Sequence, residues 1–289
     1  MKNINNILIG CAQERILDIA DSSVDCIVTS PPYWGQRDYG VDGQIGSEKS
    51  FQMYIEDLQK LFNQCKRVLK DSGTLWLNLG DKYNKGNLIG LPWRVAIALQ
   101  DDGWILRNDI IWHKPNAMPH SAKNRLTTDH EYIFFFTKKP KDYYYDQDAI
   151  REQHVTFSEN TKMKGGRNHF GKKGGTPEKG KNTGNSNLHT GRWDQAFHPN
   201  GRNKRTVWKV PLSKFREAHF AVYPEKLIEP TRLAGCTENG VVLDPFFGAG
   251  TTGVAAIKNK RNYVGIELNP EYAEIAKKRL KSVQIELLD

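Results

Sequence analysis

Two carboxylates flank a glycine-containing turn near the end of the sequence. The apolar run 241–243 leads into Asp244, and the next apolar run ends at Glu267. Gly248 and Gly250, which lie between them, permit close backbone approach to a ligand at a helix start, where N–H groups are free. No Lys follows Gly250, which disfavours a triphosphate-binding P-loop. Unless the turn is purely structural, the pattern favours a ligand with a positive charge and free ribose hydroxyls, such as S-adenosylmethionine.

A second group of residues, Thr-Ser-Pro-Pro-Tyr-Trp at 29–34, follows a short apolar run. Proline fixes φ and lacks an N–H, so the carbonyl groups of Ser30 and Pro31 have no neighbouring proline amide to pair with. These carbonyls and the Ser30 hydroxyl can accept hydrogen bonds from an exocyclic amino group, and the Tyr33 ring can stack on the base that carries it. The alternatives are a surface turn or a proline-rich WW-domain ligand, but Pro-Pro-Tyr lacks the intervening residue of such a ligand.

Alternating strands and helices position both groups. Strands that alternate with helices of twelve or more residues indicate βαβ units and a mostly parallel sheet. Asn269 and Pro270 are typical of a helix start, whereas Pro230 predicts a kink or split in a helix at 225–234. We expect strands at 25–30, 74–79, 104–112, 131–137, 241–243 and 263–268, and helices at 51–70, 88–100, 271–281 and from the glycine turn to about 260.

The positive charge of the sequence is concentrated in one segment. The chain has 42 Lys+Arg and 33 Asp+Glu, a net charge of +9. Residues 151–210 contain 13 basic and 4 acidic residues, so this segment alone has a charge of +9 and the remainder is balanced. Aromatic residues alternate with its charges, which favours a nucleic-acid contact surface over a solvated loop. These aromatic residues are Phe157, Phe170, Trp193, Phe197 and Trp208.

Composition excludes several classes of protein. A hydrophobic fraction of 38% with 7 Trp, 11 Tyr and 12 Phe is enough to bury a core, so the chain is not a disordered one. No apolar run approaches the roughly 18 residues that span a membrane, and the first residues lack a signal core, so we expect a cytoplasmic protein. The isolated cysteines predict reduced, mostly buried side chains and no metal site; they are Cys11, Cys26, Cys65 and Cys236.

Three segments together resemble the amino-methylating DNA methyltransferases. They are Ser-Pro-Pro-Tyr at 30–33, Asp-Pro-Phe-Phe-Gly-Ala-Gly-Thr-Thr at 244–252 and Val-Gly-Ile-Glu-Leu at 264–268. Their order is that of the β group of this family, in which the catalytic motif comes first and the cofactor motif last. The resemblance covers roughly residues 7–281. It implies a Rossmann-like α/β fold, circularly permuted, with a mostly parallel sheet and helices on both faces.

The resemblance also implies a division of the chain and roles for single residues. Residues 1–150 would form the catalytic part, 151–210 the target-recognition insert, and 211–289 the cofactor-binding part of the same domain. The catalytic residues would be Ser30, Pro31, Pro32 and Tyr33. The cofactor S-adenosylmethionine would contact Asp244, Pro245, Phe246, Gly248, Gly250, Thr251, Thr252, Glu267 (ribose), Leu268 (adenine), Phe220, Pro224 and Lys226. Asp81, at another strand end, is a candidate pocket residue or equally a helix cap.

Contacts to DNA are expected mainly from the insert. The candidates are Trp34, Arg37, Lys164, Arg167, Lys172, Lys173, Arg192, Arg202, Lys204 and Arg205, of which the first two follow the catalytic turn and could equally belong to a surface loop. One departure from the family concerns Gly10-Cys11, where many relatives have Gly-Asp. A thiol replaces a carboxylate acceptor poorly, so an adenine contact from this side is in doubt.

These roles predict a site-specific DNA methyltransferase that extracts a base from the duplex and holds its amino group in line with the cofactor. Relatives with Ser at the first motif position mostly methylate N4 of cytosine, so Ser30 favours cytosine. The alternatives are N6 of adenine and, less favoured, RNA or a protein amide. Double-stranded DNA is the expected partner, and a homodimer and a cognate restriction endonuclease fit the same interpretation.

Overall fold

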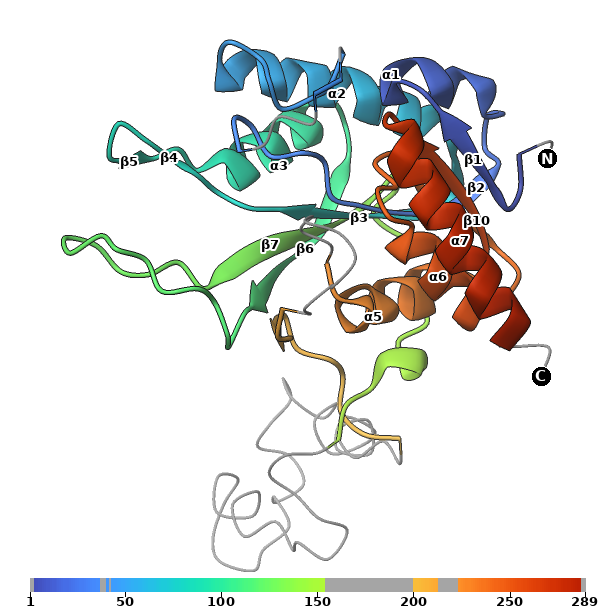
Figure 1. The fold of residues 1–289 in the computed structure, drawn as a ribbon. Helices are drawn as coiled ribbons and strands as arrows, with labels where there is room; N and C mark the ends of the chain where they lie inside the picture. Colours follow the sequence, from blue (N-terminus) through green and yellow to red (C-terminus); the bar gives the residue numbers. More distant parts are fainter. Residues whose placement is uncertain (1–2, 37–39, 42, 154–199, 213–222, 287–289) are drawn as a thin grey trace, which may run out of the picture. The chain divides into compact units, whose positions relative to one another are not determined.

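The computed structural model describes residues 3–36, 40–41, 43–153, 200–212 and 223–286. Internal contacts separate two compact units, one formed by Met1–Asp146 with Arg205–Asp289 and the other by Gln147–Lys204. The first unit contains a large sheet and the helices that cover it (Figure 1). No helix among the described residues is long and apolar enough to cross a membrane.

The first unit is built on one eight-stranded sheet. Its strands are, in spatial order, β1 (Asn6–Ile9), β10 (Asn262–Glu267), β9 (Val241–Asp244), β2 (Val24–Thr29), β3 (Leu69–Leu79), β7 (His130–Thr137), β6 (Ile105–His113) and β8 (Val207–Lys209). Neighbours are parallel from β1 to β3 and at β6 and β8, while β7 is antiparallel to both of its neighbours. The mostly parallel sheet is confirmed. The last strands of the chain lie between the first two, as a circular permutation requires.

Helices cover both faces of this sheet (Figure 1). The connection from β9 to β10 runs along the sheet in one direction, and the connections from β1 to β2 and from β2 to β3 run in the other. Because such crossovers are right-handed, the two sets of helices lie on opposite faces. One set is α1 (Ala12–Arg15), α2 (Phe51–Val68) and α3 (Leu91–Asp101), and the other is α5 (Glu225–Gly235), α6 (Thr251–Lys258) and α7 (Pro270–Glu286).

Capping and a buried stripe define α2. The Ser50 hydroxyl accepts a hydrogen bond from the N–H of Met53 at 3.3 Å, which satisfies one free group of the first turn. The apolar residues recur at helical spacing and are buried; they are Tyr54, Leu58, Leu61, Phe62, Cys65 and Val68. The same logic applies to α7, where Asn269 Oδ1 accepts from the N–H of Glu271 at 2.9 Å, as a helix start at Pro270 predicts.

Several element boundaries differ from the expectation. β3 begins at Leu69 because this residue pairs with Val24 before a register shift in β2. α3 begins at Leu91 because Leu88 pairs in a small hairpin, β4 (Tyr83–Asn84) and β5 (Asn87–Leu88), and Gly90 has a left-handed φ of +69° at the N-cap. The predicted split at Pro230 is wrong, since α5 is one continuous helix whose buried side, including Leu227 and Thr231, packs against β2 and α6.

The basic segment 151–210 overlaps the sheet at its end. The sheet takes up 207–209 as β8, so these last residues of the range 151–210 belong to the first unit. In the second unit, Glu152 and Arg202 form an isolated antiparallel bridge with backbone hydrogen bonds of 3.0 and 2.9 Å. Their side chains also form an ion pair, from Arg202 Nη2 to Glu152 Oε1 at 2.9 Å. The two ends of the insert are therefore joined directly to each other.

Candidate active site

A cavity of about 460 Å³ lies at one edge of the sheet and brings the two chemical motifs together. β2 and β9 are parallel neighbours, with Ile27 opposite Leu243, so the residues that follow both strands leave the sheet at the same edge. Among the predicted residues, those that line the cavity are Ser30, Pro31, Pro32, Tyr33, Pro245, Phe246, Gly248, Thr251, Glu267 and Leu268. Motifs more than 200 residues apart in the sequence therefore face one space.

The glycine turn after β9 presents an open cradle. Gly248 has a φ of +54°, and a Cβ at this position would meet no protein atom within 4 Å. Its N–H donates to Glu267 Oε2 at 2.7 Å, while the N–H of Asn269 donates to Oε1 at 2.8 Å. Burial raises the pKa of the Glu267 carboxyl, and these two backbone hydrogen bonds act in the opposite direction. The carboxylate is thus held at the cavity wall with acceptor capacity remaining on both oxygens.

Asp244 lies behind this turn and does not line the cavity. Its side chain is 1% exposed. Oδ1 accepts from Thr29 Oγ1 at 2.6 Å and from the N–H of Phe246 at 3.0 Å. Oδ2 accepts from Thr252 Oγ1 at 2.6 Å and from Tyr223 Oη at 3.0 Å. The sequence suggested direct contact with a ligand, but four donors already occupy this carboxylate, which instead joins the end of β2 to the turn and to α6.

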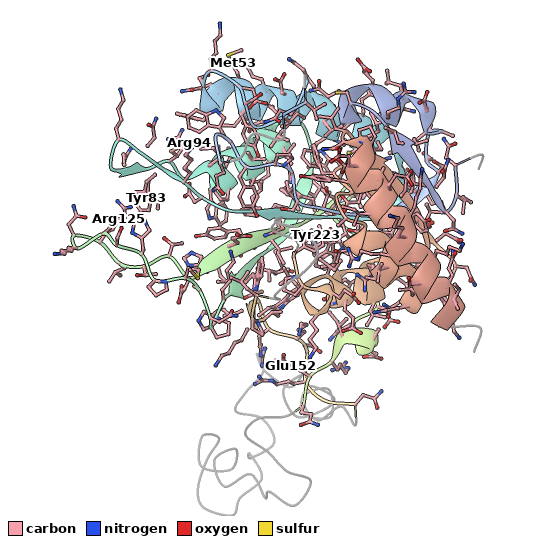
Figure 2. The ribbon with its side chains drawn as sticks, in the orientation of Figure 1. Met53, Tyr83, Arg94, Arg125, Glu152 and Tyr223 are labelled. Atoms are coloured by element: carbon pink, nitrogen blue, oxygen red, sulfur yellow. The ribbon has the colours of Figure 1, made fainter. Side chains whose placement is uncertain are left out.

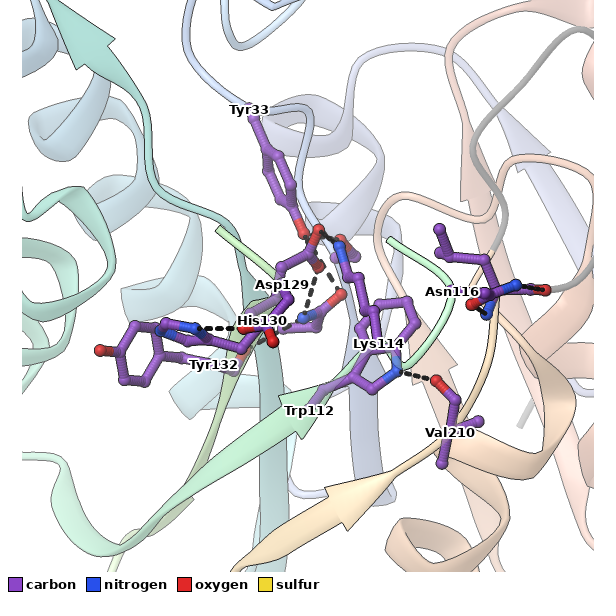
Figure 3. A network of polar contacts seen from close by, with 12 residues as sticks. Tyr33, Trp112, Lys114, Asn116, Asp129, His130, Tyr132 and Val210 are labelled. Carbon is purple, nitrogen blue, oxygen red and sulfur yellow. Dashed lines mark hydrogen bonds and ion pairs between the residues drawn. The ribbon is translucent and has the colours of Figure 1, made fainter. Parts of the chain in front are cut away.

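A polar cluster lies on the side of β2 away from β9. Figure 3 shows its Tyr33 and Lys114. Tyr33 Oη donates to Glu131 Oε2 at 2.7 Å, and Ser30 Oγ donates to Tyr33 Oη at 3.4 Å. Asn78 Nδ2 donates to the same carboxylate oxygen at 3.1 Å, and Lys114 forms an ion pair with Glu131. Burial raises the pKa of the Tyr33 hydroxyl well above its ordinary value, and the charge of Glu131 adds to this shift. Tyr33 therefore stays protonated and donates to the carboxylate.

Three members of this cluster were missed by sequence analysis. Asn78 lies on β3, Glu131 on β7 and Lys114 directly after β6, and all three line the cavity. Each stands near the end of a strand that the sequence did predict. Their association depends on the antiparallel placement of β7 between β3 and β6, which brings Tyr132 opposite Leu79 on one side and Ile111 on the other.

Other predicted residues lie outside the cavity lining. The Asp81 carboxylate accepts from the N–H of Leu91 at 3.0 Å and so caps α3, the alternative that the sequence left open. Trp34 packs on Phe51 and donates its indole N–H to the carbonyl of Glu48 at 2.8 Å. The remaining positions are Gly250 in the turn, Thr252 in α6, Pro224 just before α5 and Lys226 exposed on it, and Arg202, Lys204 and Arg205 near the end of the insert.

Some predicted residues cannot be placed. Phe220, Arg37, Lys164, Arg167, Lys172, Lys173 and Arg192 lie outside the described residues. Cys11, where the sequence departs from Gly-Asp, does line the cavity and is half-buried. The three other cysteines are buried.

Comparisons with known proteins show what this chain resembles in sequence. The sequence model of a DNA methylase family, N6_N4_Mtase, matches residues 24–278. The type II methyltransferase M.Cfr9I of Citrobacter freundii is 43% identical, over 94% of this chain and 86% of that protein. M.SmaI, the type II methyltransferase of Serratia marcescens, is 41% identical over 95% of this chain and 90% of that protein.

Solved structures share the fold. PvuII DNA methyltransferase, described as cytosine-N4-specific, superposes with a TM-score of 0.67 at 18% identity and covers 97% of this chain and 90% of its own. The complex of M1.HpyAVI with S-adenosylmethionine gives a TM-score of 0.58 at 21% identity, over 95% of this chain and 98% of its own. At these identities the likeness concerns the fold alone.

Proposed function

Because this chain belongs to the DNA methylase family that its sequence matches, we propose that it transfers a methyl group from S-adenosylmethionine to the N4 amino group of a cytosine in double-stranded DNA. The observation that carries this proposal is the order of groups along the sheet edge. The glycine turn and Glu267 follow β9 and β10, Ser30 follows β2, and the polar cluster lies on β3, β7 and β6. The methyl group of the cofactor, bound on one side, and the amino group of the base, bound on the other, would meet at Ser30.

The cofactor side fits an adenosyl group with a cationic sulfur. Glu267 would accept hydrogen bonds from the ribose hydroxyls, and the open face of Gly248 leaves room for the ligand beside the backbone. Phe246 and Leu268 supply apolar lining. When bound, S-adenosylmethionine supplies a methyl group that its sulfonium already activates. The chain's own contribution is therefore placement of the base and its amino group.

The catalytic turn is built to present acceptors. Glu131 as a carboxylate can only accept, so the Tyr33 proton points to it, and the Ser30 proton points to the Tyr33 oxygen. The lone pairs of Ser30 Oγ are then free to accept from an amino group, together with the Pro31 carbonyl. Tyr54 Oη donates to the Pro32 carbonyl at 2.9 Å, which fixes the turn. Hydrogen bonds accepted from the amino group shift electron density towards its nitrogen.

Two features support cytosine over adenine. The first motif residue is Ser30, the type that accompanies N4 methylation in this family. The second is Lys114, an ammonium donor on the base side of the cavity. A flipped base is read along its Watson–Crick edge. Cytosine offers two acceptors there beside its amino group, N3 and O2, whereas adenine offers only N1. An N6-adenine methyltransferase is the alternative.

The test is transfer of a radiolabelled methyl group from S-adenosylmethionine to unmethylated plasmid DNA, with total RNA and bulk protein as parallel acceptors. Digestion of labelled DNA to nucleosides should give N4-methyldeoxycytidine. N6-methyldeoxyadenosine would overturn the base assignment. Label in RNA or protein but not in DNA would overturn the substrate class.

The insert at 151–210 is proposed to read the target sequence. Its charge of +9 suits a polyanion. Lys172→Gln combined with Lys173→Gln should weaken DNA binding and lower the slope of log Kd against log salt by about 2, with cofactor affinity unchanged. If the double variant leaves the slope of log Kd against log salt unchanged, Lys172 and Lys173 do not contact DNA.

Partners and location follow from the type II relatives. We propose action in the cytoplasm, a homodimer, and a cognate restriction endonuclease for the same sequence. Sedimentation of the purified protein tests the dimer. Resistance of the methylated plasmid to a candidate endonuclease tests the partnership.

A further inference from the structure

Two projecting segments begin at the base side of the cavity. We name residues 82–90, which contain β4 and β5, the first arm, and residues 114–129, between β6 and β7, the second arm. The first arm follows β3, which carries Asn78, and the second arm joins Lys114 to Glu131. Both project from the same end of the sheet (Figure 1). Whatever covers the mouth of the cavity on this side must therefore lie beside both arms.

The arms contact each other. The guanidinium of Arg125 in the second arm lies 3.9 Å from the ring centroid of Tyr83 in the first (Figure 2). Arg125 Nη2 is also 3.3 Å from His120 Nε2. A cation over the face of an aromatic ring at this distance is attracted by the negative charge density of the ring. The two arms therefore form one surface, although their contact points, Tyr83 and Arg125, are 42 positions apart in the sequence.

This surface is basic, whereas the chain outside residues 151–210 is neutral as a whole. The arms contain five basic residues, Lys82, Lys85, Lys114, Lys123 and Arg125, against one acidic residue, Asp129. Lys114 is paired with Glu131, and Lys82 donates to the carbonyl of Gly35. Lys85 and Lys123 are exposed, and within the described part of the chain no carboxylate forms an ion pair with either. The arms thus carry uncompensated positive charge and begin next to residues that line the cavity.

The second arm also exposes large apolar side chains. Leu126 is 91% exposed and Met118 is 81% exposed. Proteins that deform DNA insert apolar side chains of this kind between base steps while adjacent basic residues contact phosphates. Leu126 directly follows Arg125, so an apolar group and a cation project from neighbouring positions.

We infer that the two arms grip the DNA duplex beside the extracted base, with Lys85 and Lys123 on phosphates and Leu126 in the space that the base vacates. A base in the cavity stays tied to its own sugar and phosphates, so the flanking backbone must pass the cavity mouth where the arms begin. The extracted base leaves an unstacked step, and an apolar side chain there stabilises the open duplex. The inference requires only that DNA is the substrate and is independent of which base is methylated.

The charge component is tested by Lys85→Gln combined with Lys123→Gln in the full-length protein. The matched control is Lys60→Gln with Lys277→Gln, two exposed lysines on α2 and α7. The probe is a fluorescent duplex cut from unmethylated plasmid DNA, titrated between low and moderate salt. The arm pair should lower the slope of log Kd against log salt by about 2, and the control pair should change it much less. Equal changes in both pairs would overturn the inference.

A second variant guards against a folding defect. Lys123→Glu alone should also weaken duplex binding and lower the slope, while cofactor affinity and thermal midpoint stay at the wild-type values. If duplex binding falls only together with cofactor affinity in both arm variants, the arms are structural and the inference fails.

The apolar component is tested by Leu126→Ala, with Leu17→Ala as control because Leu17 is also exposed, at 61%, on the 3₁₀ helix Ile16–Asp18. Once the modified site on the plasmid is mapped, single-turnover methyl transfer is measured on a fully paired duplex and on one with a mismatch opposite the target base. A mismatch lowers the work of extraction. Leu126→Ala should slow transfer on the paired duplex about tenfold and regain most of the rate on the mismatched one. The same loss on both would exclude Leu126 from extraction.

Discussion

Two carboxylates, one on each side of β2, accept a hydrogen bond from a tyrosine, yet their environments are opposite. Asp244 has Tyr223, two threonines and a backbone N–H as neutral donors and is 1% exposed. Glu131 has Tyr33, Asn78 and a cation, and its side chain is 15% exposed at the cavity wall. The first has no capacity left for a ligand. Glu131 is connected to Ser30 by hydrogen bonds through Tyr33. We therefore expect Asp244 to stabilise the structure of the site and Glu131 to affect the rate of methyl transfer.

The largest effect is expected from Tyr33→Ala. It removes both the ring that would stack on the base and the link between Ser30 and Glu131, and together these should lower the single-turnover rate about a thousandfold. Cofactor affinity, measured by calorimetry, should stay at the wild-type value. Loss of cofactor binding instead would mean that the two motifs have been assigned to the wrong ligands.

The same acid-to-amide change on the two sides sharpens the comparison. Glu131→Gln weakens a hydrogen bond to a charged group, worth about 1.5–3 kcal/mol, or roughly tenfold to a hundredfold in rate. The double variant with Tyr33→Phe should be no slower than Tyr33→Phe alone, because both substitutions interrupt the same series of hydrogen bonds from Ser30 through Tyr33 to Glu131. Additive losses would show that Glu131 does not act through Tyr33.

Asp244→Asn is the counterpart. The NH₂ group of the new side chain would be a donor that faces the existing donors. The free energy of unfolding should therefore fall by about 1–3 kcal/mol, and cofactor affinity should fall with it. Chemical denaturation and calorimetry measure the two. With saturating cofactor, the transfer rate should remain close to wild type, and a rate loss as large as that of Glu131→Gln would remove the distinction.

Glu267 should make cofactor binding sensitive to acid. Its pKa is raised by burial, so the carboxyl takes up a proton at a higher pH than an ordinary glutamate. The ionised form is the better acceptor for ribose hydroxyls, so affinity is full at high pH and falls, by about tenfold, as the pH drops through the raised pKa. Titrations from pH 8 to 5 measure this. Glu267→Gln should give a flatter profile, and an equally steep profile in that variant would assign the titration to another group.

The smallest effect is expected from Tyr223→Phe. Asp244 keeps three of its four donors, so unfolding free energy should fall by only about 1 kcal/mol, measured by denaturation. The transfer rate with saturating cofactor should not change. A rate loss comparable with that of Tyr33→Phe would show that the two tyrosine–carboxylate pairs are equivalent.

Local pattern was sufficient for most strands, for the cap at Asn269, and for the two motifs at strand ends. It failed where the fold is decided by distant pairing. Glu131 sits in a strand that the sequence predicts, but its neighbours follow from the antiparallel placement of β7, which no local pattern encodes. Burial of Asp244 depends on Thr29 and Tyr223, which come from other parts of the chain.

The bridge between Glu152 and Arg202 has an evolutionary consequence. Because the two ends of the recognition insert are fastened to each other, the length and sequence between them can change without altering the separation of the points where the chain leaves and re-enters. Lengthening such a closed loop has only a weak entropic penalty. The insert can thus be exchanged as a unit while the rest of the chain stays intact, and if residues 151–210 read the target as proposed, such an exchange would supply new target sequences.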